Sequence, residues 1–378
     1  MKLWRAALVS GAVAAATAGG AMAENYRAST WIPATDNHSK FGLTWFTDEV
    51  RDKTNGEIDF EVFYGGALLP AKSTLQGVAD GVAQLGFVTS GYIPSELPVA
   101  NAVSGMSFVE GDPIVMGMAF ADFYMHEPQY NDFAHNGTVA LGAFGNAPTT
   151  FHCRSEEPPT SLADLQGKRV RFPGGLIAKF ASDLGMIPVA IPAPEMYQAL
   201  QTGQVDCVSI YPTWLNIDNS LAEVSKSTLL INIVPGFNSP AQVLDADFWR
   251  SLTTEQRKIM LDASARSMAK MEIGYLTQQD QAIEMAKADG HNFGVPDQTL
   301  LDAINAWVAD GVGGQADIAR ETHHIEDPEL LFATFQKYID KWKPLVEGMT
   351  ERYNEDELTA LIKTNLTDTV DPATYGME

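Results

Sequence analysis

The residue types that could carry out catalysis are few in this chain and poorly spaced for it. His152 stands next to Cys153, and a cysteine nucleophile with a histidine base is a common catalytic pair. Neighbouring residues of a strand face opposite sides, however, so these two side chains cannot share a hydrogen bond there. His323 and His324 are also adjacent and point to different sides of a helix. We therefore expect neither a catalytic nucleophile nor a metal site.

The motifs that mark common enzymes and nucleotide-binding proteins are absent from the sequence. It contains no G-x-S-x-G, no H-E-x-x-H, no P-loop and no G-x-G-x-x-G. We therefore expect a protein that binds without turnover and needs no cofactor.

Arg169 and Arg171 lie two positions apart in 169–172, a run typical of a strand. A guanidinium presents a planar fork of N–H donors that fits the two oxygens of a carboxylate. We expect the two arginines to face opposite sides of their strand, so only one of them can face a given side. From the residues alone, an ordinary surface arginine is the favoured interpretation of Arg171.

The overall composition describes a folded, acidic protein. The chain has 378 residues, of which 45% are hydrophobic and 19% charged, enough for about two or three domains. Its 25 Lys and Arg against 48 Asp and Glu give a net charge of −23. Such a charge repels phosphate backbones, so we expect no nucleic-acid partner.

The N-terminus predicts export. Lys2 and Arg5 precede a short run of small and apolar residues, 6–18, and residues 21–23 read A-M-A. This is the pattern of a signal peptide cleaved after Ala23, so we expect the mature chain to be exported. A membrane anchor is the weaker alternative, because the run is short and rich in alanine and glycine.

The chain has two cysteines, Cys153 and Cys207. An even count in an oxidising compartment permits one disulfide, and both residues lie in predicted strands of one domain. Two separate buried thiols are the alternative.

Strands and helices alternate in two separate stretches. The first has a strand at 58–62, a helix at 70–80 and a strand at 85–88. The second has strands at 169–172, 187–191 and 205–209, separated by helices at 176–184 and 194–202. This alternation is typical of parallel α/β layers, and two similar halves indicate two lobes with a ligand between their strand ends.

The C-terminal part is predicted to be mostly helical. After a short strand at 241–244, a long helix runs from about 253 to 288 with Thr254 as its N-cap. Helices follow around 300–312, 328–345 and 355–363. We expect the last two either to pack back on the lobes or to mediate a dimer, and we favour a monomer.

Two blocks of sequence resemble a known family. Residues 161–173 read S-L-A-D-L-Q-G-K-R-V-R-F-P, and residues 197–206 read Y-Q-A-L-Q-T-G-Q-V-D. They are similar to the "s-x-x-D-L-K-G-x-K-I-R-V-P" and "Y-x-A-L-Q-T-G-x-V-D" blocks of the solute-binding proteins of TRAP transporters, the DctP-like family. Residues 244–256 resemble a third block of the family, "v-x-x-x-x-W-x-x-L-P-x-E", with Thr253 where proline is usual. The resemblance spans roughly residues 26–290.

The resemblance implies a two-lobed α/β periplasmic binding protein fold with hinge strands, a long lobe-spanning helix and a helical C-terminal region. Lobe one would comprise 24–148 and 237–276, and lobe two 149–236 and 277–378 with the C-terminal helices. Such a receptor captures a small organic acid between its lobes and delivers it to a TRAP-type permease driven by an ion gradient. The alternatives are an exported enzyme acting on a small carboxylate and the binding protein of an ATP-driven importer.

The resemblance also implies which residues hold the ligand. Arg171 matches the arginine that pairs with the ligand carboxylate in the family. Phe151 lies where some members that bind acidic sugars carry a second arginine, which suggests a more apolar wall here. The other expected ligand contacts are Trp31, Thr89, Tyr92, Ser209, Tyr211 and Asn238. For the aromatic ones, a place in the core is the alternative.

Overall fold

The computed structural model describes residues 24–145, 147–233 and 239–377. The expected signal peptide, 1–23, and one expected ligand contact, Asn238, lie outside these residues.

The first lobe is built on a five-stranded sheet with the order β2-β1-β3-β10-β4, in which β10 runs antiparallel to both neighbours. Its strands are β1 (Glu24–Ser29), β2 (Ile58–Phe63), β3 (Leu85–Gly86), β4 (Thr138–Leu141) and β10 (Gln242–Asp245). The helices of this lobe are η1 (His38–Trp45), α1 (Phe46–Lys53), η2 (Ala71–Ser73), α2 (Thr74–Ala79), η3 (Ser90–Tyr92), α3 (Pro98–Ser104), α4 (Ser107–Glu110), α5 (Pro113–His126), η4 (Pro128–Tyr130), α6 (Asp132–His135) and α10 (Ala246–Ser251).

The second lobe is built on a six-stranded sheet with the order β11-β9-β5-β8-β6-β7. Its strands are β5 (Thr149–Cys153), β6 (Arg169–Phe172), β7 (Ile187–Ala190), β8 (Cys207–Ile210), β9 (Ser227–Ile233) and β11 (Asn292–Gly294). Its helices are α7 (Leu162–Leu165), α8 (Gly175–Asp183), η5 (Ala193–Glu195), α9 (Met196–Thr202), η6 (Pro212–Leu215) and η7 (Leu221–Glu223). The antiparallel register of β5 and β8 sets Cys153 opposite Cys207, and the two form a disulfide.

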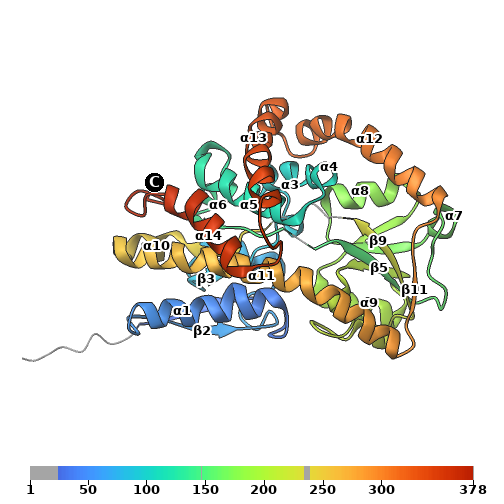
Figure 1. Cartoon of the computed structure of the whole chain (residues 1–378), viewed down its shortest axis with the longest axis horizontal. Coiled ribbons are helices and arrows are strands. Elements are labelled where there is room, and N and C mark those ends of the chain that lie inside the picture. The colour runs from blue at the N-terminus through green and yellow to red at the C-terminus, as the bar shows by residue number, and fades with distance from the viewer. Residues whose placement is uncertain (1–23, 146, 234–238, 378) are drawn as a thin grey trace, which may run out of the picture.

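The chain crosses between the lobes several times, which confirms the two-lobed fold with hinge strands. β4 of the first sheet is followed by β5 of the second, and β9 of the second by β10 of the first. In the crossing segments Phe144 pairs with Ser239 in an isolated antiparallel bridge. The helix α11 (Thr254–Ala288) is 35 residues long and contacts η1 in one lobe and η6 in the other. Figure 1 shows it running along the molecule through both lobes.

The N-cap of α11 is Thr253, so the expectation of Thr254 was wrong. The hydroxyl of Thr253 accepts a hydrogen bond from the backbone N–H of Gln256, whose side chain accepts one from the backbone N–H of Thr253. This reciprocal pair requires a spacing of three residues, which Thr253 has and Thr254 lacks.

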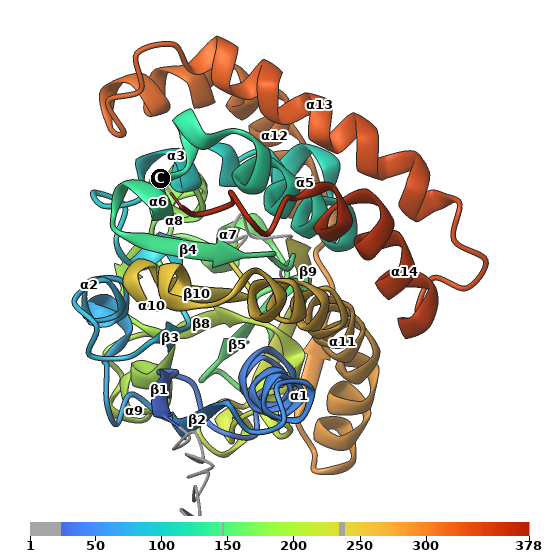
Figure 2. The ribbon, with the colours of Figure 1, turned by 90° about the vertical axis from the view of Figure 1, so that its left-hand side faces the viewer.

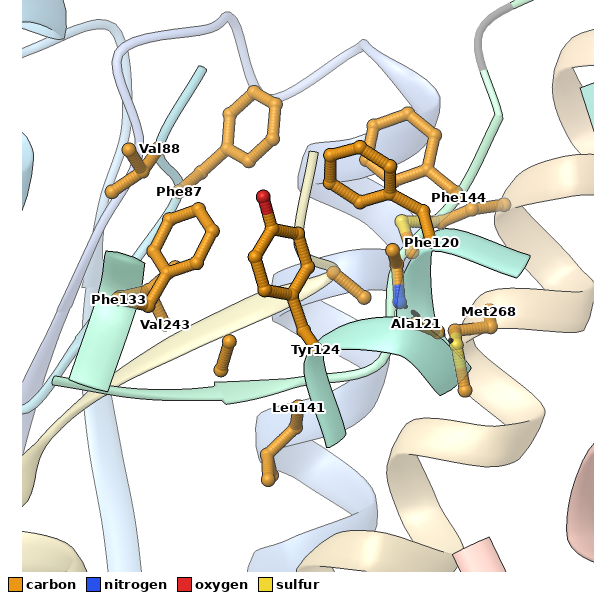
Figure 3. Close-up of a cluster of buried hydrophobic side chains, with 14 of the residues drawn as sticks. Phe87, Val88, Phe120, Ala121, Tyr124, Phe133, Leu141, Phe144, Val243 and Met268 are labelled. Atoms are coloured by element: carbon orange, nitrogen blue, oxygen red, sulfur yellow. Dashed lines mark hydrogen bonds between the residues drawn. The ribbon is translucent and has the colours of Figure 1, made fainter. Parts of the chain in front are cut away.

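The core of the first lobe contains helix α5, which the sequence patterns did not predict. All but the last of its residues are buried, so the helix lacks the polar face that makes a helical period visible. Figure 3 shows Phe120 and Tyr124 of α5 among Phe133, Val243 and Met268 from surrounding elements.

The C-terminal helices are α12 (Gln298–Glu321), α13 (Pro328–Glu347), α14 (Glu355–Asn365) and η8 (Thr367–Thr369). α13 packs on α5, and α14 packs on α11 (Figure 2). The buried carboxylate of Asp122 in α5 accepts hydrogen bonds from both Lys341 and Trp342 of α13. The expected assignment of all of 277–378 to the second lobe was therefore wrong for α13 and α14. Asp122 needs these donors in the first lobe, because a buried carboxylate without partners is costly.

Candidate ligand-binding site

A cavity lies where the two lobes meet. Its wall includes residues of both lobes, of the crossing segments and of α11. Six of the expected ligand contacts line it, namely Trp31, Thr89, Tyr92, Arg171, Ser209 and Tyr211. A wall of aromatic rings with a few polar groups is typical of small-molecule sites.

Arg171 of β6 is 1% exposed and faces this cavity. Its Nε donates to the carbonyl oxygen of Ile191 at 2.7 Å, and its Nη1 to that of Ser209 at 3.1 Å. Its Nη2 donates to the hydroxyl of Tyr92 at 3.1 Å. These three bonds fix the plane of the guanidinium. A guanidinium has five N–H donors, so two have no partner among the described residues and are free for an anion.

Tyr92 connects the two lobes at this point. It lies in η3 of the first lobe, and its hydroxyl accepts hydrogen bonds from Arg171 and from the backbone N–H of Ala193, at 3.1 and 2.9 Å. Both donors belong to the second lobe. The lobes are therefore joined directly beside the group that would hold an anion.

Arg169 has a different environment, but not for the reason expected. Residues two apart in a strand share a face, so the expectation that Arg169 and Arg171 face opposite sides was wrong. What separates them is their position along β6. The side chain of Arg169 is 41% exposed and is paired with Asp206 at 2.6 Å, away from the cavity wall. Asp206 thereby secures the start of β6 through Arg169, in keeping with its expected structural role.

Phe151 does not line the cavity. It is fully buried in the core of the second lobe, where its ring meets that of Phe172 edge-on at 5.7 Å. The apolar part of the cavity wall comes instead from the first lobe, the crossing segments and α11. Trp31 stacks on Phe87 at 5.4 Å, and Phe144 stacks on Tyr275 at 5.8 Å.

Sequence reasoning missed Phe87, Phe144, Tyr275 and Asp36, all of which line the cavity. Phe144 lies in a crossing segment without periodicity, and Tyr275 lies among apolar positions of α11 that read equally well as core. A sequence signal was present only for Phe87, which lies in the predicted strand 85–88, two positions before Thr89. The indole N–H of Trp31 is buried without an acceptor among the described residues, so the cavity offers another donor beside those of Arg171.

Comparison with known proteins identifies the family. Residues 28–306 match the model of the bacterial extracellular solute-binding proteins, family 7 (DctP). The match covers well over half of the chain, and the chain belongs to this family. Solved structures with the same fold include binding proteins of TRAP transporters, the family that the two sequence blocks indicated.

Individual relatives are distant. The ectoine-binding periplasmic protein TeaA of Halomonas elongata is 22% identical over 218 residues, which are 56% of this chain and 61% of that protein. The chain thus matches less than two thirds of the length of this relative. The C4-dicarboxylate-binding periplasmic protein DctP of Rhodobacter capsulatus is 23% identical over 62% of this chain and 69% of its own length.

Solved structures share the fold. A TRAP periplasmic solute-binding protein of Bordetella bronchiseptica, crystallised with mandelate, superimposes with a TM-score of 0.71 at 20% identity. The superposition covers 84% of this chain and 99% of the other. Among the described residues, no helix is both long and apolar enough to cross a membrane, and no three His, Cys, Asp or Glu side chains are grouped as metal ligands.

Proposed function

We propose that this protein is a periplasmic receptor that captures a small carboxylate between its lobes and delivers it to a TRAP-type permease. The observation that carries the proposal is Arg171, a buried arginine that faces the cavity and has two N–H donors without a partner among the described residues. A planar guanidinium with unused donors fits the two oxygens of a carboxylate.

The remaining wall limits the kind of carboxylate. The aromatic rings of Trp31, Phe87 and Phe144 offer apolar surface rather than a second cationic group. Phe151 stands where a second arginine occurs in members that bind acidic sugars, and it lies in the core. These features favour a monocarboxylate with a compact apolar body over a dicarboxylate.

We propose that binding occurs without turnover and that the TRAP-type permease is the partner. Membership of a family of extracellular solute-binding proteins supports both. It also favours this partner over an ATP-driven importer. The exported enzyme that the sequence left as an alternative has no supporting constellation among the described residues of the cavity, whose wall holds neither Cys nor His.

A thermal-shift screen of the chain from Glu24 onward against small organic acids tests the proposal. A bound acid raises the melting temperature as its concentration exceeds the dissociation constant, by about 2.7 kcal/mol of stability at a hundredfold excess. Mass spectrometry after incubation should recover the acid unchanged. Recovery of a chemically altered acid would identify an enzyme instead.

A further inference from the structure

The cavity that contains Arg171 also contains a buried carboxylate, Asp36, which lies just before η1. Asp36 is 1% exposed. Its Oδ1 accepts hydrogen bonds from the hydroxyl of Tyr275 at 2.6 Å and from the backbone N–H of His38 at 2.8 Å. Both donors are neutral, so these bonds orient the carboxylate without neutralising it.

A second buried carboxyl group, Asp218, lies within electrostatic range of Asp36. Burial raises the pKa of both groups, and the nearby Asp36 raises the pKa of Asp218 further. The hydrogen bonds from Tyr275 and His38 and the charge of Lys40 oppose the rise for Asp36, so Asp218 is the member of the pair that holds a proton first. Asp36 then carries the negative charge. The charged side chains that line the cavity are Arg171 and Asp36, one of each sign.

This balance constrains the ligand. A simple monocarboxylate bound to Arg171 would leave the closed cavity with a net charge of −1, a costly state in a buried site. A ligand that also carries a cationic nitrogen brings the total to zero. Tyr275, which binds Asp36, stacks on Phe144, so aromatic faces stand beside the carboxylate. Aromatic faces attract cations, and desolvation strengthens this attraction.

Tyr211 shows that the two charged groups share one site. It lines the cavity, and its pKa is raised well above the usual value, mainly by burial, then by Asp36, while Arg171 opposes the shift. Tyr211 therefore lies within electrostatic range of both groups, and a small molecule in this cavity meets both.

We propose that the solute is a zwitterion, whose carboxylate binds Arg171 and whose cationic nitrogen faces Asp36 among the aromatic rings. This inference rests on the proposed function, since it names the class of carboxylate that the same site takes.

Matched ligand pairs test the inference by calorimetry at pH 7. Each pair shares a carboxylate skeleton and differs in the cationic nitrogen: betaine with 3,3-dimethylbutanoate, proline with cyclopentanecarboxylate, and phenylglycine with phenylacetate. In at least one pair, the zwitterion should bind tenfold or more tightly than its partner. The inference is overturned if, in every pair, the acid without the cationic nitrogen binds as tightly as the zwitterion or more tightly. It is also overturned if none of the six probes binds.

Protein variants distinguish a failure of the zwitterion inference from a failure of the proposed carboxylate receptor. Asp36→Asn should weaken binding of the zwitterion at least thirtyfold and spare any binding of its partner acid, whereas Asp48→Asn, at an exposed position of α1, should change neither. Arg171→Ala should weaken both members of a pair. If Arg171→Ala weakens binding but Asp36→Asn does not, the zwitterion is wrong and the carboxylate receptor stands. If Arg171→Ala has no effect on a probe that binds, the proposed function itself fails.

Discussion

Tyr92 is the residue through which the first lobe contacts the guanidinium of Arg171. Its hydroxyl accepts from one donor of Arg171 and from the backbone N–H of Ala193. Without that oxygen, closing the lobes would bury two N–H donors with no acceptor, at a cost of about 1–3 kcal/mol each. In the open receptor, water can bind the same donors.

Tyr92→Phe is therefore expected to weaken solute binding by about ten- to a hundredfold while leaving the fold intact. Titration calorimetry of the two proteins measures the difference. Tyr197→Phe is the matched control, because the Tyr197 hydroxyl binds Glu223 outside the cavity at 2.8 Å. Native affinity in Tyr92→Phe would contradict a role for this contact in closure.

At the scale of single residues, the sequence identified polar residues of the cavity wall better than apolar ones. Arg171, Ser209 and Tyr211 lie on or just after strands whose ends were visible in the sequence, and all three reach the cavity. Phe151 lies on a strand too, directly opposite Ser209, but its ring packs on Phe172 in the core of the second lobe. Which neighbour a strand residue packs on depends on the tertiary fold, which alternation does not reveal.

Among the helices, α11 carries a buried acid that couples stability to pH. Glu272 is 1% exposed, and its Oε2 accepts from the backbone N–H of Gly145 in a crossing segment at 3.0 Å. Burial raises the pKa of Glu272 to about 8, although the Gly145 bond lowers it. The folded protein therefore holds a proton that the unfolded chain releases above about pH 4.5, so this group lowers stability as pH rises towards 8.

Glu272→Gln removes this titration and keeps an oxygen that can accept from Gly145. Relative to the native protein, the free energy of unfolding of the variant should rise by about 1–2 kcal/mol between pH 6.5 and pH 8. Urea denaturation at both pH values measures it. Glu284→Gln, at an exposed position of α11, should show no such trend; a pH-independent difference for Glu272→Gln would contradict a protonated Glu272.

Helices with one exposed face were predicted better than the helix without one. The 35 residues of α11 were predicted almost to their ends, and α13 and α14 within a few residues, because each has a polar side. α5 is buried nearly throughout, so it shows no period and was not predicted. Burial did not decide the outcome for strands, since β8 and β10 are fully buried and were predicted, whereas β4, equally buried, was not.

At the scale of the whole molecule, the C-terminal helices bear on assembly. The sequence left open whether they pack back or form a dimer contact, and the structure places α13 on α5 with Trp342 fully buried. Little of the apolar surface of α13 is then left for a second copy. We predict a monomer, and light scattering of the chain from Glu24 onward should give the mass of one chain. A stable mass of two chains would contradict this.

The sequence could not predict on which part of the molecule α13 and α14 pack. Residues 277–378 follow the second lobe in the chain, so assigning them to it was natural. The decisive contact, between Asp122 and the side chains of Lys341 and Trp342, joins positions about two hundred residues apart. No local pattern records such a pairing.

The central claim is that Arg171 holds the carboxylate of the solute in the closed cavity. Truncating one partner of a buried, hydrogen-bonded charge pair costs about 2–5 kcal/mol. With the acid found by the screen, calorimetry should show Arg171→Ala at least thirtyfold weaker than the native protein. Arg171→Lys should also be weaker, since one ammonium cannot reproduce the planar fork, and circular dichroism should show both variants folded. Arg169→Ala, whose side chain pairs with Asp206 away from the cavity, should bind normally. Native affinity in a folded Arg171→Ala variant would contradict the account.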